Sequence, residues 1–281
     1  MAFKLFSKHA EQTATPSVSD KTYLEHRYSE WLKSPEREEM LVAERYYDGE
    51  HDINEKVRTA IGSDGSLVVV ENLPNNKIVD NQYRKCVDQK ANYALSKPLT
   101  IATENDEYSE RLVKIFGKRN SKQMKRLCRS SVNGGVAYLF PYIDSVGMLR
   151  FKVFPGYELM PVWEDHEHDV LIGGVRGYMA QEWKDGAIRD VEHIEVYSAD
   201  GVDCFVRKGG KFIPESIPHK DYLIGKDGSP YNWGRLPIIP FKYNDKEIPL
   251  IRNVKCLQDA INKLLSTFQD NLEEDPRNTI L

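Results

Sequence analysis

The hydrophobic pattern of the chain changes near residue 135, and this change constrains the fold more than any other feature. Before it, apolar residues recur with the period of about 3.6 residues that marks amphipathic helices. From 136 to 213 the pattern becomes short apolar runs separated by turns such as DSVG, PG, DG and GG. Such runs are typical of an antiparallel meander. The sequence therefore predicts an α+β fold, with helices first and a sheet after them.

Five helices are expected in the first part, at about 20–33, 35–49, 76–97, 106–116 and 121–133. Ser34-Pro35-Glu36 is a strong start signal for the second helix, because it combines a cap, a proline at the first helical position and an early acid. Asp64-Gly65 predicts a turn into a short strand that ends at Val70. Gly117 and Gly134 are expected to stop the last two helices.

The helix expected at 76–97 is the most polar of these. Its start is assigned to a cap at Asn75 or Asn76 and its end to Pro98, after which residues 99–103 read as a strand. Its predicted buried stripe contains Val79, Tyr83, Cys86 or Val87, Lys90 through its stem, and Ala94.

A second long helix is predicted at about 247–274, after a loop at 225–240. At 100° per residue, one narrow side collects a packing stripe of Val254, Leu257, Ile261, Leu264, Leu265, Phe268 and Leu272. Charged residues cluster on the opposite side, namely Arg252, Asp259, Lys263 and Asp270, and the acidic end of the helix adds Glu274 to this charged face.

Composition excludes several classes of protein. With 281 residues, 40% of them apolar, the chain can bury a real core. A net charge of −4 argues against attraction of the whole surface to phosphate. The four cysteines form no C-x-x-C pair, and no window has the roughly 18 apolar residues of a membrane helix. Residues 1–18 are interpreted as a disordered arm, because they lack the apolar core of a signal peptide.

Two local patterns offer alternatives. Residues 118–129 carry a basic patch that suits phosphates, and a nucleic-acid-binding or processing protein is the alternative function that this patch supports. The patch consists of Lys118, Arg119, Lys122, Lys125, Arg126 and Arg129. The stretch EDHEHD at 164–169, with His166 and His168, has the composition of a metal site but lacks visible further ligands. It supports a third hypothesis, a metal-dependent enzyme.

No catalytic motif stands out. The glycine pairs fit neither a dinucleotide-binding nor a P-loop pattern, and no nucleophile elbow or zincin motif is present. We therefore expect no enzyme activity, no cofactor and no metal.

Four stretches, in this order, resemble the portal (head–tail connector) proteins of tailed bacteriophages in the siphophage-like branch. They are RYYDGEHDI at 45–53, the segment at 76–100 through Val87, Asp88, Lys90, Tyr93, Leu95, Lys97 and Pro98, the hairpin at 133–165, and WGRLPIIPFKYNDKEIPL at 233–250 with the helix after it. The resemblance implies a wing domain at 19–240, helical over 19–133 and β-rich over 136–224. It also implies a stem helix at 245–281, whose charged face meets the DNA channel or a neighbouring subunit.

The resemblance further implies a ring of about twelve subunits at one capsid vertex, as a closed symmetric oligomer. Double-stranded DNA would be packaged and ejected through its channel with weak, non-specific contacts. The implied partners are the terminase packaging motor, head-completion (adaptor) proteins, and the major capsid or scaffolding protein, with assembly in the host cytoplasm and no membrane. Portal chains continue into a clip, a second stem helix, a channel loop and a crown, so we expect that a chain ending at Leu281 is a truncated gene, a fragment or a split chain.

Overall fold

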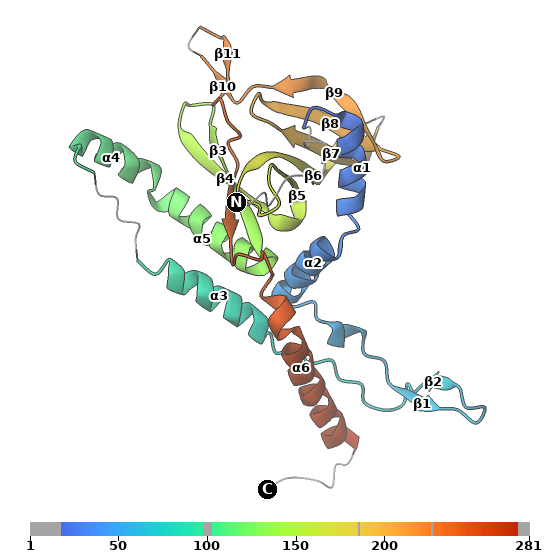
Figure 1. The fold of residues 1–281 in the computed structure, drawn as a ribbon. Helices are drawn as coiled ribbons and strands as arrows, with labels where there is room; N and C mark the ends of the chain where they lie inside the picture. The colour runs from blue at the N-terminus through green and yellow to red at the C-terminus, as the bar shows by residue number, and fades with distance from the viewer. Residues whose placement is uncertain (1–17, 98–102, 185, 226, 275–281) are drawn as a thin grey trace, which may run out of the picture. The chain divides into compact units, whose positions relative to one another are not determined.

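The computed structural model of the protein describes residues 18–97, 103–184, 186–225 and 227–274. Contacts divide these residues into two compact units. The sheet unit contains residues 18–33, 145–147 and 158–238, and the helical unit contains 34–144, 148–157 and 239–274. Figure 1 traces both units along the chain.

Helices account for most of the first half of the chain and for its last described part. Their bounds are α1 (Lys21–Trp31), α2 (Pro35–Asp48), the 3₁₀ turn η1 (Asp52–Glu55), α3 (Gln82–Ala94), α4 (Asp106–Ile115), α5 (Lys118–Gly134), the 3₁₀ turn η2 (Gly156–Glu158) and α6 (Ile251–Glu274). The strands are β1 (Thr59–Ile61), β2 (Leu67–Val69), β3 (Val136–Ile143), β4 (Leu149–Pro155), β5 (Leu159–Trp163), β6 (Leu171–Lys184), β7 (Ala187–Tyr197), β8 (Val202–Lys208), β9 (Lys211–Lys220), β10 (Leu223–Ile224), β11 (Pro230–Tyr231) and β12 (Ile239–Lys242).

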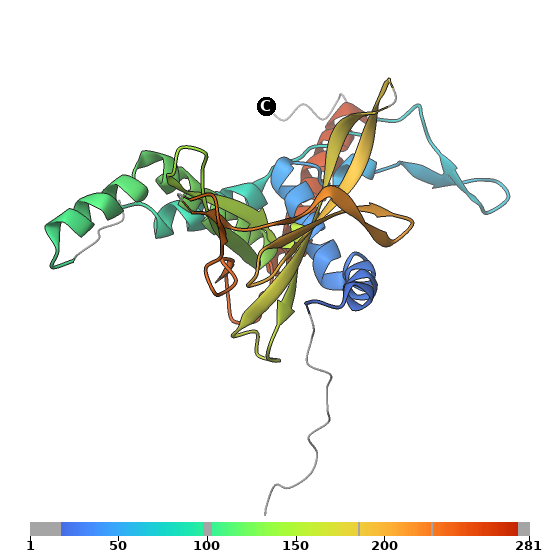
Figure 2. The same cartoon turned by 90° about the horizontal axis from the view of Figure 1, so that it is seen from above.

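The sheet unit is built on a five-stranded antiparallel meander, β5-β6-β7-β8-β9. Helix α1 lies on one face of it, and Figure 2 shows the long β6–β7 hairpin from above. The core between helix and sheet contains Leu24, Tyr28, Met160, Val162, Val175, Ile194, Val196 and Phe212. One glycine is essential here, because the Tyr28 hydroxyl occupies the space where a Cβ of Gly177 would lie.

The helical unit contains a three-stranded antiparallel sheet, β12-β3-β4, with α5 packed across it (Figure 1). One core lies between them and contains Leu127, Ala137, Leu139, Phe151 and Val153. A second core joins α2, α3, α5 and the start of α6, through Ala43, Tyr46, Tyr83, Val87, Val132, Leu250 and Ile251. The first turn of α6 is therefore anchored inside this unit.

Several elements lie where short sequence motifs predicted them. Ser34 caps α2 through a hydrogen bond from the Arg37 amide, Pro35 is the first helical residue, and Gly49 ends the helix at φ 93°. The Asp64-Gly65 turn does lead into a strand, which pairs with Thr59–Ile61 as the β1–β2 hairpin. The expected α+β class and the antiparallel pairing of the middle region are also confirmed.

The helix expected at 76–97 begins later than predicted. α3 starts at Gln82 with Asn81 as its cap, so the predicted caps at Asn75 and Asn76 are wrong. Residues 74–81 have no regular secondary structure, because α6 binds the backbone of this segment, as described below. The buried side of α3 consists of Tyr83, Val87 and Ala91, whereas Cys86 and Ala94 are exposed.

Other boundaries shift by a few residues. The meander is divided between two sheets, and the predicted loop at 225–240 contains the β10–β11 turn and the first residues of β12. The last helix begins at 251, four residues later than predicted. Pro98, most of the strand expected at 99–103, and nearly all of the arm at 1–18 lie outside the described residues.

Candidate functional site

Helix α6 is the best candidate for a functional element of the helical unit. It has 24 residues and therefore a length of about 36 Å at about 1.5 Å per residue. After its buried first residue, Ile251, all of its buried residues are polar, whereas its large apolar residues are exposed or half-buried. This arrangement reverses the usual one for a helix in a soluble protein.

A row of four polar side chains forms the buried side of α6. Gln258, Asn262, Ser266 and Asp270 recur every fourth residue, and each is at most 4% exposed. Residues four apart lie above one another on a helix, so the row is a single stripe. All four side chains make hydrogen bonds, as buried polar groups must if the fold is to be stable.

The row binds the extended segment that precedes α3. Asp270 accepts a hydrogen bond from the Asn76 amide at 2.7 Å, and Ser266 accepts one from the Ile78 amide at 2.9 Å. The Asp80 amide donates to the Asn262 oxygen at 3.1 Å. Gln258 Oε1 then accepts the Tyr83 amide at 2.8 Å, at the start of α3. The side chains of α6 thus take the place of a neighbouring strand.

The match between helix and segment is geometric. Four helical residues rise about 6 Å, and two extended residues advance about 6.6 Å. From Asn76 to Asp80, every second amide therefore meets the next side chain of the row, whereas the Tyr83 amide follows three residues later, at the start of α3. We call this contact, formed by 76–83 and the four side chains on α6, the polar zipper.

An ion pair closes the far end of the polar zipper. Lys56 Nζ lies 2.5 Å from Asp270 Oδ2 and also donates to the Asn76 carbonyl. Burial alone would raise the pKa of Asp270, but the hydrogen bonds from Lys56 and Asn76 outweigh it and lower the pKa to about 2. Asp270 is therefore ionised at neutral pH and is fully engaged inside the unit.

A buried histidine supports the middle of the polar zipper. His51 is 1% exposed and stacks on Tyr46, with ring centroids 4.5 Å apart. Its Nε2 lies 2.9 Å from the Tyr46 carbonyl and its Nδ1 lies 2.7 Å from the Asn262 amide nitrogen. A neutral ring satisfies both contacts, donating from Nε2 and accepting at Nδ1. Burial, the largest influence, lowers the pKa of His51 and favours this neutral form.

Charges of alternating sign connect the start of α6 to α2 and η1. Lys255 contacts Asp52 at 2.5 Å and Asp259 at 2.7 Å, and Arg45 also binds Asp52. Burial opposes ionisation of Asp52, but the hydrogen bonds from Lys255 and Arg45 dominate and hold its pKa far below the usual range. Burial, together with the hydrogen bond to Asp259, raises the pKa of Tyr46 to about 12. The base of α6 is thus fixed by a connected network.

Most of the apolar stripe predicted for α6 faces away from this unit, although Val254 packs against its core. Leu257, Leu264 and Phe268 are 64%, 70% and 54% exposed, and Ile261 and Leu272 are also exposed. Val254 and Leu265 are half-buried. A row of large apolar side chains in water favours contact with another apolar surface.

The predicted charged residues of α6 have different surroundings. Arg252 donates hydrogen bonds to the Glu39 carboxylate from Nε and from Nη2. Glu274 pairs with Arg58. Asp259 belongs to the network around Lys255, and Asp270 is buried in the polar zipper. Lys263 is exposed. These five residues therefore do not form one common face towards solvent.

The basic patch lies on the outer side of α5. Lys122, Lys125 and Arg126 are exposed, and Arg129 pairs with Asp88 of α3 at 3.0 Å. The side chains of Lys118 and Arg119 lie outside the described part of the structure.

The EDHEHD stretch forms the turn between β5 and β6. Asp165 accepts hydrogen bonds from the Asp169 and Val170 amides, and His168 stacks on Trp163. Across the described residues, no group of three His, Cys, Asp or Glu side chains is placed to hold a metal ion.

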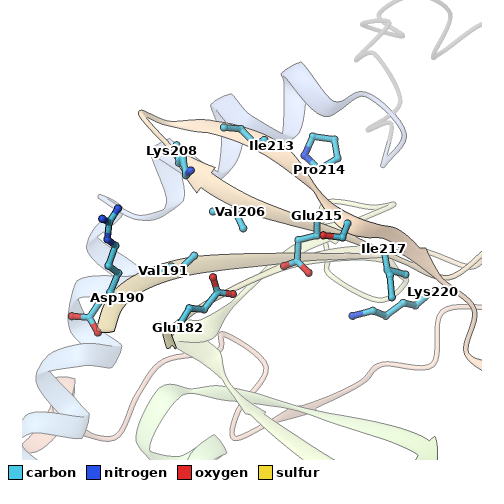
Figure 3. Close-up of a pocket in the computed structure, with 12 residues that line it drawn as sticks. Glu182, Asp190, Val191, Val206, Lys208, Ile213, Pro214, Glu215, Ile217 and Lys220 are labelled. Carbon is cyan, nitrogen blue, oxygen red and sulfur yellow. The ribbon is translucent and has the colours of Figure 1, made fainter. Parts of the chain in front are cut away.

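A groove of about 740 Å³ lies in the sheet unit, over β6 to β9. Figure 3 shows Glu182 and Glu215 reaching into it from β6 and β9, beside Lys220 and Ile217. The two carboxylates contact opposite nitrogens of His193, at 3.1 and 2.7 Å. They are thus held apart by one imidazole and do not converge on a single point.

Sequence reasoning missed the polar zipper. The row on α6 could have been found from the sequence, because Gln, Asn, Ser and Asp recur at every fourth residue and so mark one polar side of the helix. Lys56, Asn76 and His51 carry no such signal, since their partners on α6 lie 194 or more positions away in the chain. Among the residues that the structure describes, no helix is long and apolar enough to span a membrane.

Comparison with known proteins places the chain in a family. The profile of the family "Phage portal protein, SPP1 Gp6-like" matches residues 33–281. The portal protein of Bacillus phage SPP1 is 27% identical over 243 residues, covering 84% of this chain and 47% of that protein. The portal protein of Clostridium phage phiCD119 is 23% identical over 256 residues, covering 85% of this chain and 53% of that protein. The chain therefore spans about half the length of these relatives. Because the profile covers most of its residues, the chain belongs to the SPP1 Gp6-like family of phage portal proteins.

Proposed function

We propose that this chain forms part of a portal subunit, which assembles with copies of itself into a ring around a channel for double-stranded DNA. The ring occupies one vertex of the phage head and serves DNA packaging, ejection and the joining of head to tail. Its role is structural and non-catalytic. The observation that carries this proposal is that α6 buries polar side chains and exposes apolar ones. Membership of the portal family supports it.

The exposure of apolar side chains on α6 supports assembly for a physical reason. Its polar row is already satisfied inside the unit, so this row holds the helix in place. Among the residues that the structure describes, nothing covers most of its apolar stripe, and Leu257, Leu264 and Phe268 are more than half exposed. Burying apolar surface yields about 25 cal/mol per Å², so a second apolar surface against this stripe is favourable. In a ring, other stem helices supply that surface. Helix α6 is then the first stem helix, and residues 19–240 form the wing.

Net charge fits a channel through which DNA slides. The residues of this chain carry a net charge of −4 in each subunit, so this part of a ring is acidic and repels the phosphates of DNA. A lumen coated with Lys and Arg would instead hold the duplex and slow its passage.

The remaining partners follow from this role. The ring contacts the terminase motor during packaging, head-completion proteins afterwards, and the capsid or scaffolding protein around the vertex. Its place is the virion, after assembly in the host cytoplasm. Family membership supports these partners at the level of the portal class.

Electron microscopy of negatively stained protein tests this function. The intact protein that carries this sequence should form closed rings with a central hole. A protein that stays monomeric at micromolar concentration would contradict the proposal.

A further inference from the structure

The basic surface of α3 and α5 has no part in the proposed stem, yet it gathers positive charge. Residues 118–129 contain six Lys or Arg and no Asp or Glu, in a chain whose net charge is −4. Figure 1 shows α3 and α5 side by side in the helical unit, and the two helices are in contact. The local charge is thus opposite to that of the whole chain.

Two arginines on this surface are held in place. The guanidinium groups of Arg84 and Arg129 lie over the Tyr47 ring, 5.1 and 5.7 Å from its centroid. Asp88 accepts a hydrogen bond from the Tyr47 hydroxyl at 2.9 Å and pairs with Arg129 at 3.0 Å and with Arg84 at 3.8 Å. The Asp88 carboxylate therefore holds both guanidinium groups in place, and the three groups together carry a net charge of +1. Both side chains remain accessible, with 55% and 44% of their surface exposed.

The lysines continue this surface along α5. Lys122, Lys125 and Arg129 are three and four residues apart, so they line one side of the helix, and Arg126 lies next to them. From Lys122 to Arg129 the helix rises by seven steps of about 1.5 Å, or about 10.5 Å. One strand of a DNA duplex presents a phosphate about every 3.4 Å of axis, hence about three phosphates over this length. Three cations thus face about as many phosphates.

We propose that Arg84, Lys122, Lys125, Arg126 and Arg129 form a binding surface for the phosphate backbone of double-stranded DNA, separate from α6. The fixed arginine pair suits a rigid polyanion, because a guanidinium offers a planar fork to phosphate oxygens and little freedom is lost on binding. The surface holds DNA without reading its sequence, since backbone contacts carry no base information. A duplex that slides past α6 without being held there thus meets an attractive surface elsewhere on the same subunit. This last point rests on the proposed function, whereas the binding itself does not.

Salt dependence of DNA binding tests the surface. Five phosphate contacts give a slope of log K against log salt of about −4.5, so affinity for a random-sequence duplex should fall about 500-fold between 50 and 200 mM salt. Replacing Lys122, Lys125 and Arg126 by Gln leaves two contacts, and the fall should then be only about 12-fold. The matched control replaces Lys208, Arg235 and Lys246 by Gln, three exposed residues that remove the same charge elsewhere. The control should behave as the wild type.

A conservative variant tests the arginine pair. Arg129→Lys keeps the charge but loses the fork, so the salt slope should stay the same while affinity at 50 mM falls several-fold. Fluorescence anisotropy with a labelled 30-base-pair duplex measures both quantities, and circular dichroism checks the fold.

Three results would overturn the proposal: no binding of the duplex at 50 mM salt, equal losses in the two triple variants, or tighter binding of polyglutamate than of DNA. The last would assign the surface to an acidic protein. None of these results affects ring formation, so failure of this proposal is distinguishable from failure of the proposed function.

Discussion

His51 shows how a single residue can support a long contact. Its neutral ring accepts a hydrogen bond from Asn262, and protonation would place two donors against each other. The surrounding charges differ in sign, with Asp259 favouring protonation and Arg45 opposing it. Burial dominates, so the pKa of His51 in the folded protein lies below its ordinary value.

Stability should therefore depend on pH through His51. Because the folded pKa is lowered, the unfolded chain binds a proton first, and stability is lost as pH falls below about 6.5 towards the folded pKa. The slope from this group is at most about 1.4 kcal/mol per pH unit. Urea unfolding between pH 7.5 and 5.5 measures it.

The variant His51→Gln should flatten this dependence. His26→Gln is the matched control, because the His26 side chain is 73% exposed. His219 contributes a pH dependence of stability with the opposite sign, because its hydrogen bond with Asp203 raises its pKa. The difference between wild type and His51→Gln isolates the buried residue. An unchanged pH profile in His51→Gln would disprove this role.

Because the pKa of Asp270 is lowered in the folded protein, we expect a second loss of stability at acidic pH. Its pKa of about 2 means that its contribution is complete above its ordinary value near 3.8 and disappears as pH falls towards 2. At neutral pH, Asp270→Asn should cost about 2 kcal/mol of unfolding free energy, because charged hydrogen bonds contribute about that much. The exposed Asp245→Asn is the control and should change stability little. Equal effects in both variants, measured by urea unfolding, would show that the buried ion pair adds nothing.

At the scale of elements, the polar zipper defines how α6 is held. The segment at 76–80 has no regular secondary structure, yet α6 accepts its alternate amides. We predict that the amides of Ile78 and Asp80 exchange slowly with solvent deuterium. Ser266→Ala removes one acceptor, and its cost of about 1 kcal/mol should speed exchange of the Ile78 amide about fivefold. Thr267→Ala, at the exposed neighbouring position, should leave that exchange unchanged. Fast exchange of the Ile78 amide in the wild type would refute the contact.

The same contact explains which elements the sequence could predict. Ser34, Pro35 and Gly49 define α2 through neighbours within four residues, so local rules suffice. The start of α3 depends on Gln258, which is 175 positions away from Tyr83, and no local rule reports such a partner. Asn76 looked like a helix cap because its side chain suits one, but Asp270 binds both its amide and its side chain.

The candidate site was predictable to a similar extent. The period of α6 correctly separates an apolar stripe from the polar residues. It cannot say which side faces the protein, because burial depends on the partner and not on the period. The row from Gln258 to Asp270 is buried since every member finds a hydrogen-bond partner in 76–83 or nearby. Leu264 and Phe268 are exposed although they are the more hydrophobic residues.

At the scale of the whole molecule, the exposed apolar stripe of α6 implies assembly. The mass of the assembly in solution tests this claim most directly, and sedimentation velocity or native mass spectrometry measures it. The intact protein should form one closed species at a fixed multiple of its subunit mass. Leu264→Glu with Phe268→Glu should convert it to folded monomers, while Lys208→Glu with Lys246→Glu, at exposed positions outside α6, should not. A wild type that stays monomeric, or an assembly that survives both glutamates on α6, would contradict the account.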